Sequence, residues 1–309
     1  MANLYVFHQG FDYVPDGGQL SDKIHLWYNV FDGNTWSGDT LIRGVNLGTS
    51  PYAVPWLGGI SLFHQGGSST DGPTGTIAYT YSPNGRNWGA DTPVQQVGMS
   101  EHPSLVVYKG KLYVFHQGYA GNGELWYFTY DGTNWSGDTQ IRNVGMSASP
   151  AAVVWAGGIT VFHQGYHDDG QLWYTYSPDG TNWGGDTLVQ PVPELQGDNV
   201  PMSLSPSAVV YKGKLYVFCQ GPGQNGGLSY VAFDGNRWYG FGPQLPNLGM
   251  SESPSAVAWA GGITVFHQGS HHGGELWYTY SPDGTNWGGD THVQPGLLRM
   301  SGSPSAIVF

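Results

Sequence analysis

One four-residue motif, Phe-His-Gln-Gly, recurs along the chain and constrains its fold more than any other feature of the sequence. Around each copy the same order of segments appears: an apolar run led by Pro, a tight turn, the motif, a loop, a segment such as ELWY, and a turn followed by Trp. Each unit therefore holds four short alternating segments separated by Gly, Asp, Asn and Pro, with no helical period. The second position of the motif is occupied, at intervals of 47 to 56 residues, by His8, His64, His116, His163, Cys219 and His267.

Four strands in a repeat of about 40–50 residues are the signature of a β-propeller blade. Six copies predict an all-β fold, a six-bladed β-propeller of four-stranded antiparallel blades in a single domain. The chain begins on the second strand of a blade and ends on a first strand, so residues 303–309 are expected to complete blade 1 and close the ring. The expected blades are 1–49 with 303–309, 50–100, 101–148, 149–203, 204–251 and 252–302.

A second period, two blades long, is superimposed on the first. The first turn of the unit reads Tyr-Lys-Gly-Lys at 108 and 211 but Trp-x-Gly-Gly at 56, 155 and 259. The later turn reads FDG or YDG in the odd blades and YSPxG in the even blades. The sequence therefore predicts three copies of a two-blade unit, which favours an even number of blades. The stretch SPDGTNW also resembles the aspartate box of sialidase propellers, one residue shorter, and that box is a structural turn.

Composition excludes several classes of function. A net charge of −12 with only 10 Lys and Arg opposes both a nucleic-acid backbone and an anionic membrane surface. No apolar stretch approaches the ~20 residues of a transmembrane helix, and a lone Cys219 excludes an internal disulfide. The N-terminal MANLYVFHQG has no basic region, apolar core or cleavage site. We therefore expect synthesis in the cytoplasm without a signal peptide, which is compatible with later release to act outside the cell.

Positions kept in nearly every copy are expected to serve the blade itself. A Trp follows the later turn in all six copies, and these rings are expected to pack between blades: Trp36, Trp88, Trp135, Trp183, Trp238 and Trp287. The Asp before a Thr in the last segment is expected to act as a turn and cap hydrogen-bonder, at Asp39, Asp91, Asp138, Asp186 and Asp290.

The ELWY segment varies between copies in a way that indicates a ligand site. Residues i and i+2 of a strand share a face, so each Trp is expected beside a polar side chain: His25 with Trp27, Glu124 with Trp126, Gln171 with Trp173, and Glu275 with Trp277. Blades 2 and 5 have lost both members of the pair. A core seldom tolerates the loss of a Trp without compensation. The paired loss therefore favours a pocket that has decayed, with packing as the alternative.

Topology is expected to bring further groups to these pockets. The loop between the second and third strands opens on the same face as the link to the next blade. The candidate ligand-binding set therefore also includes His8, His116, His163, His267, Glu101 and Glu252. A histidine at the motif position could equally hydrogen-bond a neighbouring loop. Indole, carboxylate, amide and hydroxyl groups with almost no Arg or Lys suit a neutral sugar.

Metal and cofactor chemistry find little support in the sequence. His167-Asp168-Asp169 and His271-His272 are weak candidates for metal ligands, because no repeated ligand spacing supports them. We therefore predict no metal, no cofactor and no catalytic residue.

The repeat SPSAVVYKGKLYVFHQG…GELWYTYSPDGTNWGGDT resembles that of the bacterial and fungal β-propeller lectins of the Psathyrella and Photorhabdus type, over essentially the whole chain. The resemblance implies binding of fucose and related sugars, some O-methylated, in pockets between blades. Those lectins usually have seven blades, and six is nearer in number to the Aleuria-type fucose lectins. The sequence thus predicts a multivalent lectin and hemagglutinin for glycans on glycoproteins or glycolipids, compatible with a homo-oligomer and not an enzyme. Two alternatives stay open: a glycoside hydrolase or sialidase-like enzyme, which needs two carboxylates at a defined separation, and a protein-binding scaffold.

Overall fold

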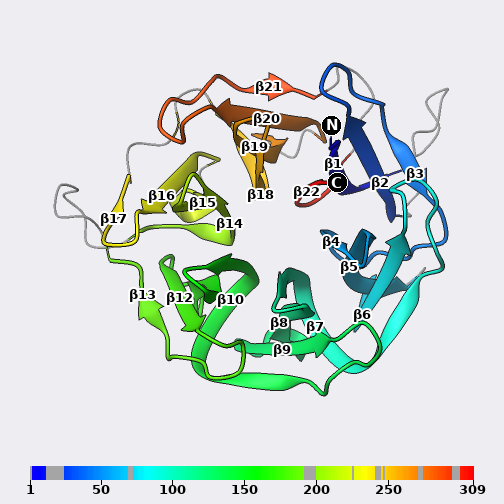
Figure 1. The fold of residues 1–309 in the computed structure, drawn as a ribbon, viewed down its shortest axis with the longest axis horizontal. Helices are drawn as coiled ribbons and strands as arrows, with labels where there is room; N and C mark the ends of the chain where they lie inside the picture. The colour runs from blue at the N-terminus through cyan, green and yellow to red at the C-terminus, as the bar shows by residue number, and fades with distance from the viewer. Residues whose placement is uncertain are drawn as a thin grey trace.

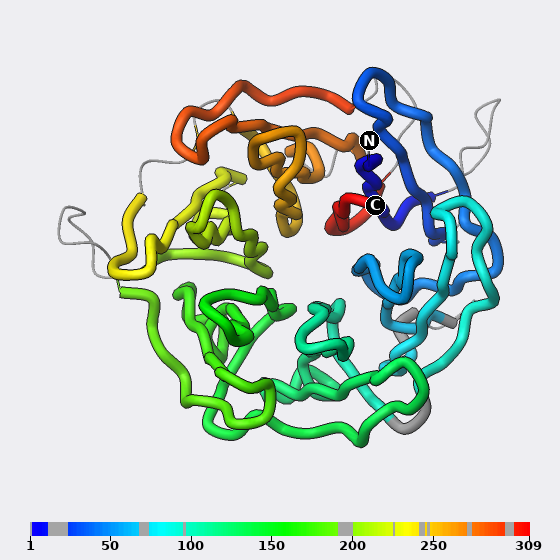
Figure 2. Tube along the Cα trace, in the orientation of Figure 1, coloured from blue at the N-terminus to red at the C-terminus, as the bar shows by residue number. Residues whose placement is uncertain are grey.

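The computed structural model describes residues 2–11, 24–68, 72–190, 200–224, 226–240, 245, 248–270, 274–293 and 300–309. Within these residues the strands form six four-stranded antiparallel blades arranged as a ring around a central opening (Figures 1 and 2). The helical elements described are two 3-10 turns, η1 (Tyr119–Gly121) and η2 (Pro222–Gln224). The described part of the chain contains no helix with the length and apolar character needed to cross a membrane.

The blades follow one another along the chain, each running from an inner strand at the axis to an outer strand at the rim. Blade 1 contains β22 (Ser305–Val308), β1 (Leu4–Phe11), β2 (Ile24–Phe31) and β3 (Thr40–Ile42), and blade 2 contains β4 (Tyr52–Trp56), β5 (Gly59–Ser68), β6 (Gly72–Ser82) and the first part of β7 (Thr92–Tyr108). Blade 3 contains the rest of β7, β8 (Lys111–Gly118), β9 (Glu124–Tyr130) and the first part of β10 (Thr139–Trp155), and blade 4 contains the rest of β10, β11 (Gly158–Gly165), β12 (Leu172–Ser177) and β13 (Thr187–Leu188). Blade 5 contains β14 (Ser203–Tyr211), β15 (Lys214–Gln220), β16 (Leu228–Phe233) and β17 (Trp238–Tyr239), and blade 6 contains β18 (Met250–Trp259), β19 (Gly262–Gly269), β20 (Leu276–Ser281) and β21 (Thr291–His292).

The C-terminal strand closes the ring, as the sequence predicted. β22 pairs with β1 in antiparallel register, from Leu4 opposite Val308 to Phe7 opposite Ser305. Asn3 and Phe309 exchange backbone hydrogen bonds of 2.8 and 2.9 Å beyond the end of the ladder. The two termini therefore lie side by side in Figure 1, and the innermost strand of blade 1 comes from the far end of the chain.

The repeated Trp side chains pack between blades, as predicted. Trp88 of blade 2 meets the ring of Phe7 in blade 1 edge to face, with centroids 5.5 Å apart. The same contact recurs at every seam, and each of these Phe residues is fully buried. The other five pairs are Trp135 with Phe63, Trp183 with Phe115, Trp238 with Phe162, Trp287 with Phe218, and Trp36 with Phe266.

The two-blade period has its physical cause at the seam that runs from an odd blade to an even blade. The hydroxyl of Tyr108 in blade 3 lies 2.6 Å from the carbonyl oxygen of Gly157 and 2.8 Å from that of Pro178, both in blade 4. Gly180, in the YSPxG turn, has a φ of +86° and lies directly against the Tyr113 ring, so a Cβ there would collide with that ring. An even blade therefore needs this turn to pack against the tyrosines of the odd blade before it.

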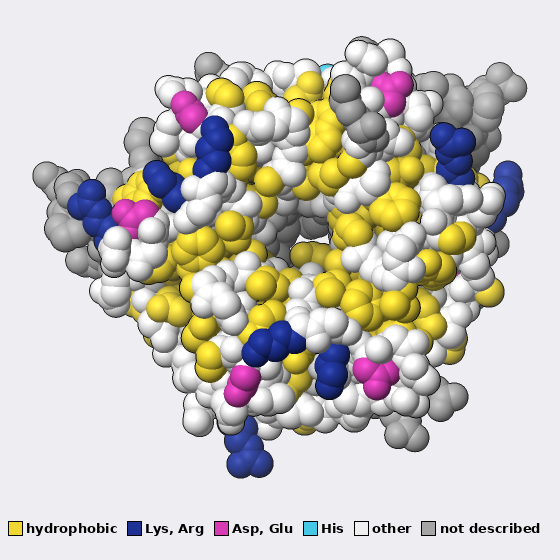
Figure 3. All heavy atoms as spheres, in the orientation of Figure 1, with side chains coloured by type: hydrophobic (Ala, Val, Ile, Leu, Met, Phe, Trp, Pro, Cys, Tyr) yellow, Lys and Arg dark blue, Asp and Glu magenta, His cyan; other side chains and the backbone are white. Residues whose placement is uncertain are grey.

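Figure 3 shows one face of the ring. Hydrophobic side chains gather there around the central opening, and charged side chains lie nearer the rim.

Candidate functional site

Each second strand ends and each third strand begins at the same end of the ring, which we call the loop face. In blade 3, the indole Nε1 of Trp126 donates to Oε2 of Glu124 at 3.1 Å, and Asn122 Nδ2 donates to the same oxygen at 2.8 Å. In blade 6, Trp277 Nε1 donates to Oε2 of Glu275 at 3.3 Å. Both Trp side chains are half-buried. The structure therefore brings together the Trp and carboxylate of these two blades at the start of the third strand.

Blade 4 builds the same pair from a different position. Trp173 Nε1 donates to Oδ2 of Asp169 at 2.9 Å, and Gln171 contributes its backbone N–H to Oδ1 of Asp169, also at 2.9 Å. The residue expected beside this Trp was Gln171, and the structure adds Asp169 as the acceptor of the indole hydrogen bond. Asp169 stands four residues before its Trp, where blade 3 has Asn122. Asp169 could have been found from the sequence, because blade 4 has Gln in place of the Glu of ELWY and carries an Asp in the loop just before it.

A glycine lets these loop side chains come close to the end of the second strand. The last residue of the Phe-His-Gln-Gly motif is Gly118 in blade 3 and Gly165 in blade 4. A Cβ on Gly118 would collide with the side chain of Asn122, and one on Gly165 with that of Asp169. The motif glycine is therefore part of the site, because it leaves the space that the loop side chain occupies.

Blades 1, 2 and 5 differ from this arrangement. Trp27 is half-buried opposite His8 in the strand register, and His25 is partly buried at the start of β2. In blades 2 and 5 the Trp position holds Ala78 and Ser229, both buried. These two blades therefore present no indole at the loop face.

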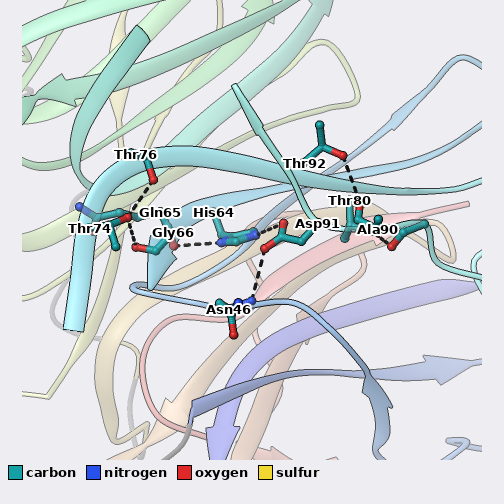
Figure 4. A network of polar contacts seen from close by, with 11 residues as sticks. Asn46, His64, Gln65, Gly66, Thr74, Thr76, Thr80, Ala90, Asp91 and Thr92 are labelled. Atoms are coloured by element: carbon teal, nitrogen blue, oxygen red, sulfur yellow. Dashed lines mark hydrogen bonds and ion pairs between the residues drawn. The ribbon is translucent and has the colours of Figure 1, made fainter. Parts of the chain in front are cut away.

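The motif histidines lie inside the blades. All five are 0–1 % exposed. In each, Nε2 lies 2.9–3.1 Å from a carboxylate oxygen of the Asp in the same blade, and Nδ1 lies 2.9–3.2 Å from the next residue's carbonyl oxygen. Figure 4 shows this for His64, Asp91 and Gln65. As a correction, His8, His116, His163 and His267 leave the candidate site, since neither their surface nor their ring nitrogens are available to a ligand.

The Asp residues that pair with these histidines were expected to stabilise turns. In the structure they also hold the histidine ring, and two of them contact the preceding blade. Oδ2 of Asp186 accepts the backbone N–H of Gly145 in the preceding blade at 2.9 Å, and Oδ2 of Asp91 accepts that of Asn46 at 3.3 Å (Figure 4). In blades 2 and 4 the His–Asp pair therefore links its blade to the one before. In blade 5 both members are replaced: Cys219 takes the place of His, and residues 239–245 contain no Asp. Burial raises the pKa of the Cys219 thiol to about 12.

Glu101 and Glu252 lie in an axial pocket. This pocket has a volume of about 970 Å³, and it is lined by the links between blades and by the loops of blades 3, 4 and 5. Both glutamates have φ near +60°, at the irregularity where β7 and β18 shift register. Enclosure by the pocket walls raises the pKa of the Glu101 carboxyl, and the negative charge of Glu252 adds to this effect. The structure thus divides the expected site into two parts, the Trp–carboxylate pairs of the loop face and the axial pocket.

A belt of hydrogen bonds forms the floor of the axial pocket. Around the axis, the backbone N–H of one blade donates to the hydroxyl of the next, as from Ser149 to Ser205 at 2.9 Å and from Ser205 to Ser253 at 3.0 Å. The belt continues through Ser303 and Ser50, and His102 takes the sixth position. Burial lowers the pKa of His102 to about 4.

Two exposed tyrosines at the loop face were missed by the sequence reasoning. Tyr119 is 63 % exposed and Tyr166 is 49 % exposed. The Tyr166 ring lies against Gly123 and Gly145 of blade 3, and it is tilted by 38° against the His167 ring, with centroids 3.9 Å apart. The Tyr119 ring lies in the same way against glycines of blade 2. The available signal was a Tyr directly after the motif, which occurs only in blades 3 and 4.

Among the described residues, no group of three or more His, Cys, Asp and Glu side chains is placed to hold a metal ion. His167 and Asp168 lie exposed in the loop of blade 4, and Asp169 is bonded to Trp173. The other sequence candidates, His271 and His272, lie outside the described residues.

No family model matches the sequence, and a comparison with curated proteins gives no match. The structure is similar to a triple mutant of AofleA from Arthrobotrys oligospora, with a TM-score of 0.64 and 14% identity over 98% of this chain and 89% of that chain. It is similar to Aleuria aurantia lectin in complex with Fucα1-6GlcNAc, with a TM-score of 0.59 and 15% identity over 96% of each chain. It is also similar to Penicillium chrysogenum α-L-arabinanase, with a TM-score of 0.59 and 14% identity over 86% of this chain and 89% of that chain. These likenesses support the six-bladed propeller fold.

Proposed function

We propose that the protein is a multivalent lectin that binds neutral sugars at the Trp–carboxylate pairs of the loop face. The observation that carries the proposal is the half-buried indole fixed to a carboxylate, present in blades 3, 4 and 6. An indole held in one orientation offers a flat apolar surface to the C–H face of a pyranose. The carboxylate can then accept hydrogen bonds from the sugar hydroxyls.

The carboxylate of blade 3 has the capacity for such a bond. The hydrogen bonds from Trp126 and Asn122 both reach Oε2 of Glu124, which leaves Oε1 to accept from a sugar hydroxyl. The charge balance of the chain favours an uncharged ligand, since a net charge of −12 repels anions. Fucose is the first sugar to test, because Aleuria aurantia lectin, which shares the fold, is in complex with a fucosylated disaccharide. O-methylated sugars are the next.

The number of sites sets the expected avidity. Blades 3, 4 and 6 carry the complete pair, and blade 1 carries Trp27 with His25 at the same position. A shallow sugar pocket of this kind binds near millimolar, or about −4 kcal/mol. About four such sites on one face of a ring raise the avidity for a glycosylated surface by ~10²–10⁴ when they engage together.

The test is binding to a glycan array, with free monosaccharide as the competitor. We expect binding to fucosylated or O-methylated glycans that free sugar inhibits. Binding to no glycan, or binding that free sugar leaves unchanged, contradicts the proposal.

Glycoside hydrolysis in the axial pocket is the second candidate function. The observation that favours it is the paired placement of Glu101 and Glu252, with the pKa of Glu101 raised, as a general acid requires. The assay is release of reducing sugar from the glycans that bind, with Glu101→Gln as the matched variant. Release that depends on Glu101 supports an enzyme, and its absence from the wild type rejects one.

A further inference from the structure

A cavity of about 420 Å³ lies at the seam between blades 6 and 1, toward the end of the ring opposite the loop face. Blade 6 contributes Trp259 at the end of β18 and Tyr278 from β20, and blade 1 contributes Phe31 at the end of β2 and Trp36 from the turn that follows. The Trp–carboxylate pairs and the axial pocket lie at the other end of the blades. This cavity is therefore separate from both sites described above.

Aromatic rings form the walls of this cavity. The ring of Phe31 meets Trp259 edge to face with centroids 5.4 Å apart, and it lies 5.0 Å from the Trp36 ring. Trp36 lies 6.4 Å from Tyr278. All four side chains are only partly buried, so they keep surface that faces the open space between them.

Among the residues that the structure describes, the lining of the cavity includes no Asp, Glu, Lys or Arg. Its polar side-chain groups are all uncharged: the hydroxyls of Thr264, Thr291, Tyr278 and Tyr280 and the indole N–H groups of Trp36 and Trp259. The Tyr280 hydroxyl already donates to the carbonyl oxygen of Ala260 at 3.3 Å. The cavity on the other side of blade 1 has nearly the same volume, about 440 Å³, but it is lined by Asp32, Arg86 and several hydroxyl groups. An aromatic, uncharged lining is therefore a property of this seam and not of every seam.

The aromatic set recurs with the two-blade period. The seam from blade 2 to blade 3 carries Trp56, Tyr79, Tyr130 and Trp135 at the corresponding positions, and the seam from blade 4 to blade 5 carries Trp155, Tyr174, Phe233 and Trp238. All eight are partly buried. An arrangement kept at each even-to-odd seam is part of the two-blade unit.

We propose that the aromatic cavity between blades 6 and 1 binds an uncharged small molecule through an aromatic six-membered ring. A volume of about 420 Å³ lies within the range of ligand pockets, which are mostly apolar with a few polar groups. A ring inserted there makes stacked and edge-to-face contacts with several neighbours and restores dispersion contacts that the empty space lacks. A charged ligand loses its hydration there and finds no partner charge. The proposal does not depend on the lectin function.

The test uses benzyl alcohol as the neutral probe, with benzoate and benzylammonium as its charged counterparts and methyl α-L-fucoside as the sugar. Binding is followed through the indole N–H resonances of Trp36 and Trp259, which report on this seam alone. We expect benzyl alcohol to shift both resonances, and the charged probes to bind at least about tenfold more weakly. We expect the fucoside to leave both resonances unchanged.

Two variants test the location. Trp259→Ala removes one wall and is expected to weaken the benzyl alcohol response of Trp36 at least about tenfold. Thr291→Trp adds a ring at an exposed lining position, so it blocks the cavity without removing a packed side chain, and it is expected to have the same effect with an unchanged melting temperature. Trp277→Ala, at the loop face of the same blade, is the matched control and is expected to leave the probe bound.

Three outcomes overturn the proposal: no response of the wild type to benzyl alcohol, an equal response to benzoate, or an unchanged response in Thr291→Trp. Probe binding without any sugar binding contradicts the lectin function and supports this cavity as a site. Sugar binding without probe binding supports the lectin function and contradicts the proposal that this cavity is a site.

Discussion

Replacing Trp126 and Trp135 by Ala separates a ligand-binding Trp from a structural one in the same blade. Trp126 is half-buried at the loop face and donates one hydrogen bond to Glu124. Trp135 packs against the rings of Phe63, Phe128 and Tyr130, with centroids 6.0, 5.4 and 4.4 Å away. The first variant is expected to lose a site, and the second to lose stability.

The expected magnitudes follow from these contacts. Removal of a packed Trp costs about 3–5 kcal/mol, and the lower end applies to Trp135 because its side chain is only partly buried. For 309 residues the unfolding entropy is about 0.65 kcal/mol per kelvin, so Trp135→Ala is expected to melt about 5 °C lower. Trp126→Ala loses a hydrogen bond of about 1 kcal/mol and some apolar contact, which lowers the melting temperature by about 2–3 °C.

The binding assay is calorimetric titration with the sugar that the glycan array selects. The wild type is expected to bind sugar at about four sites. Trp126→Ala is expected to bind at about three sites with unchanged affinity. Trp135→Ala is expected to keep the wild-type number of sites at temperatures below its melting temperature. If Trp126→Ala abolishes all binding or leaves the stoichiometry unchanged, the assignment of the pocket is refuted.

Four further predictions concern the ring and its buried groups. Deletion of 303–309 removes the β22–β1 ladder and is expected to lower the melting temperature by at least about 5 °C, and an unchanged melting curve contradicts closure. His102→Ser completes the serine belt: because the folded protein keeps the pKa of His102 near 4, the wild type loses stability as the pH falls from about 6.5 to 4, and the variant is expected to lose less over that window in pH-dependent melting. Cys219 is expected to resist alkylation in the native protein and to react after unfolding, since burial holds its pKa near 12, and rapid native labelling refutes this. Sugar binding is expected to survive EDTA, and its loss with restoration by calcium refutes a metal-independent site.

The propeller could be predicted from the sequence because every blade packs against its neighbour through the same residues. A Trp after the later turn meets the Phe of the preceding blade at each seam, so both residues recur with the blade period. The two-blade period was visible as a difference in turns, but its cause was not. The contact between Gly180 and Tyr113 joins residues of different blades that only the folded ring brings together.

The site was predicted less completely, for reasons of geometry. The pairs of Glu124 with Trp126 and Glu275 with Trp277 follow from strand alternation, whereas the partner of Trp173 depends on the path of a loop. The sequence placed Glu101 on the same face of the ring as the indoles, but in the structure Glu101 lies in the axial pocket. The order of the strands gives the face on which a residue lies and not its distance from the axis. The His–Asp pair had a readable signal, since Cys219 and the missing Asp occur in the same blade.

A crystal structure with methyl α-L-fucoside, or with the sugar that the array selects, tests the central claim most directly. The account predicts sugar rings stacked on Trp126, Trp173 and Trp277, each with a hydroxyl hydrogen-bonded to the carboxylate that holds the indole, and a fourth sugar ring on Trp27 beside His25. Sugar found only in the axial pocket between Glu101 and Glu252, with these indoles unoccupied, would contradict it.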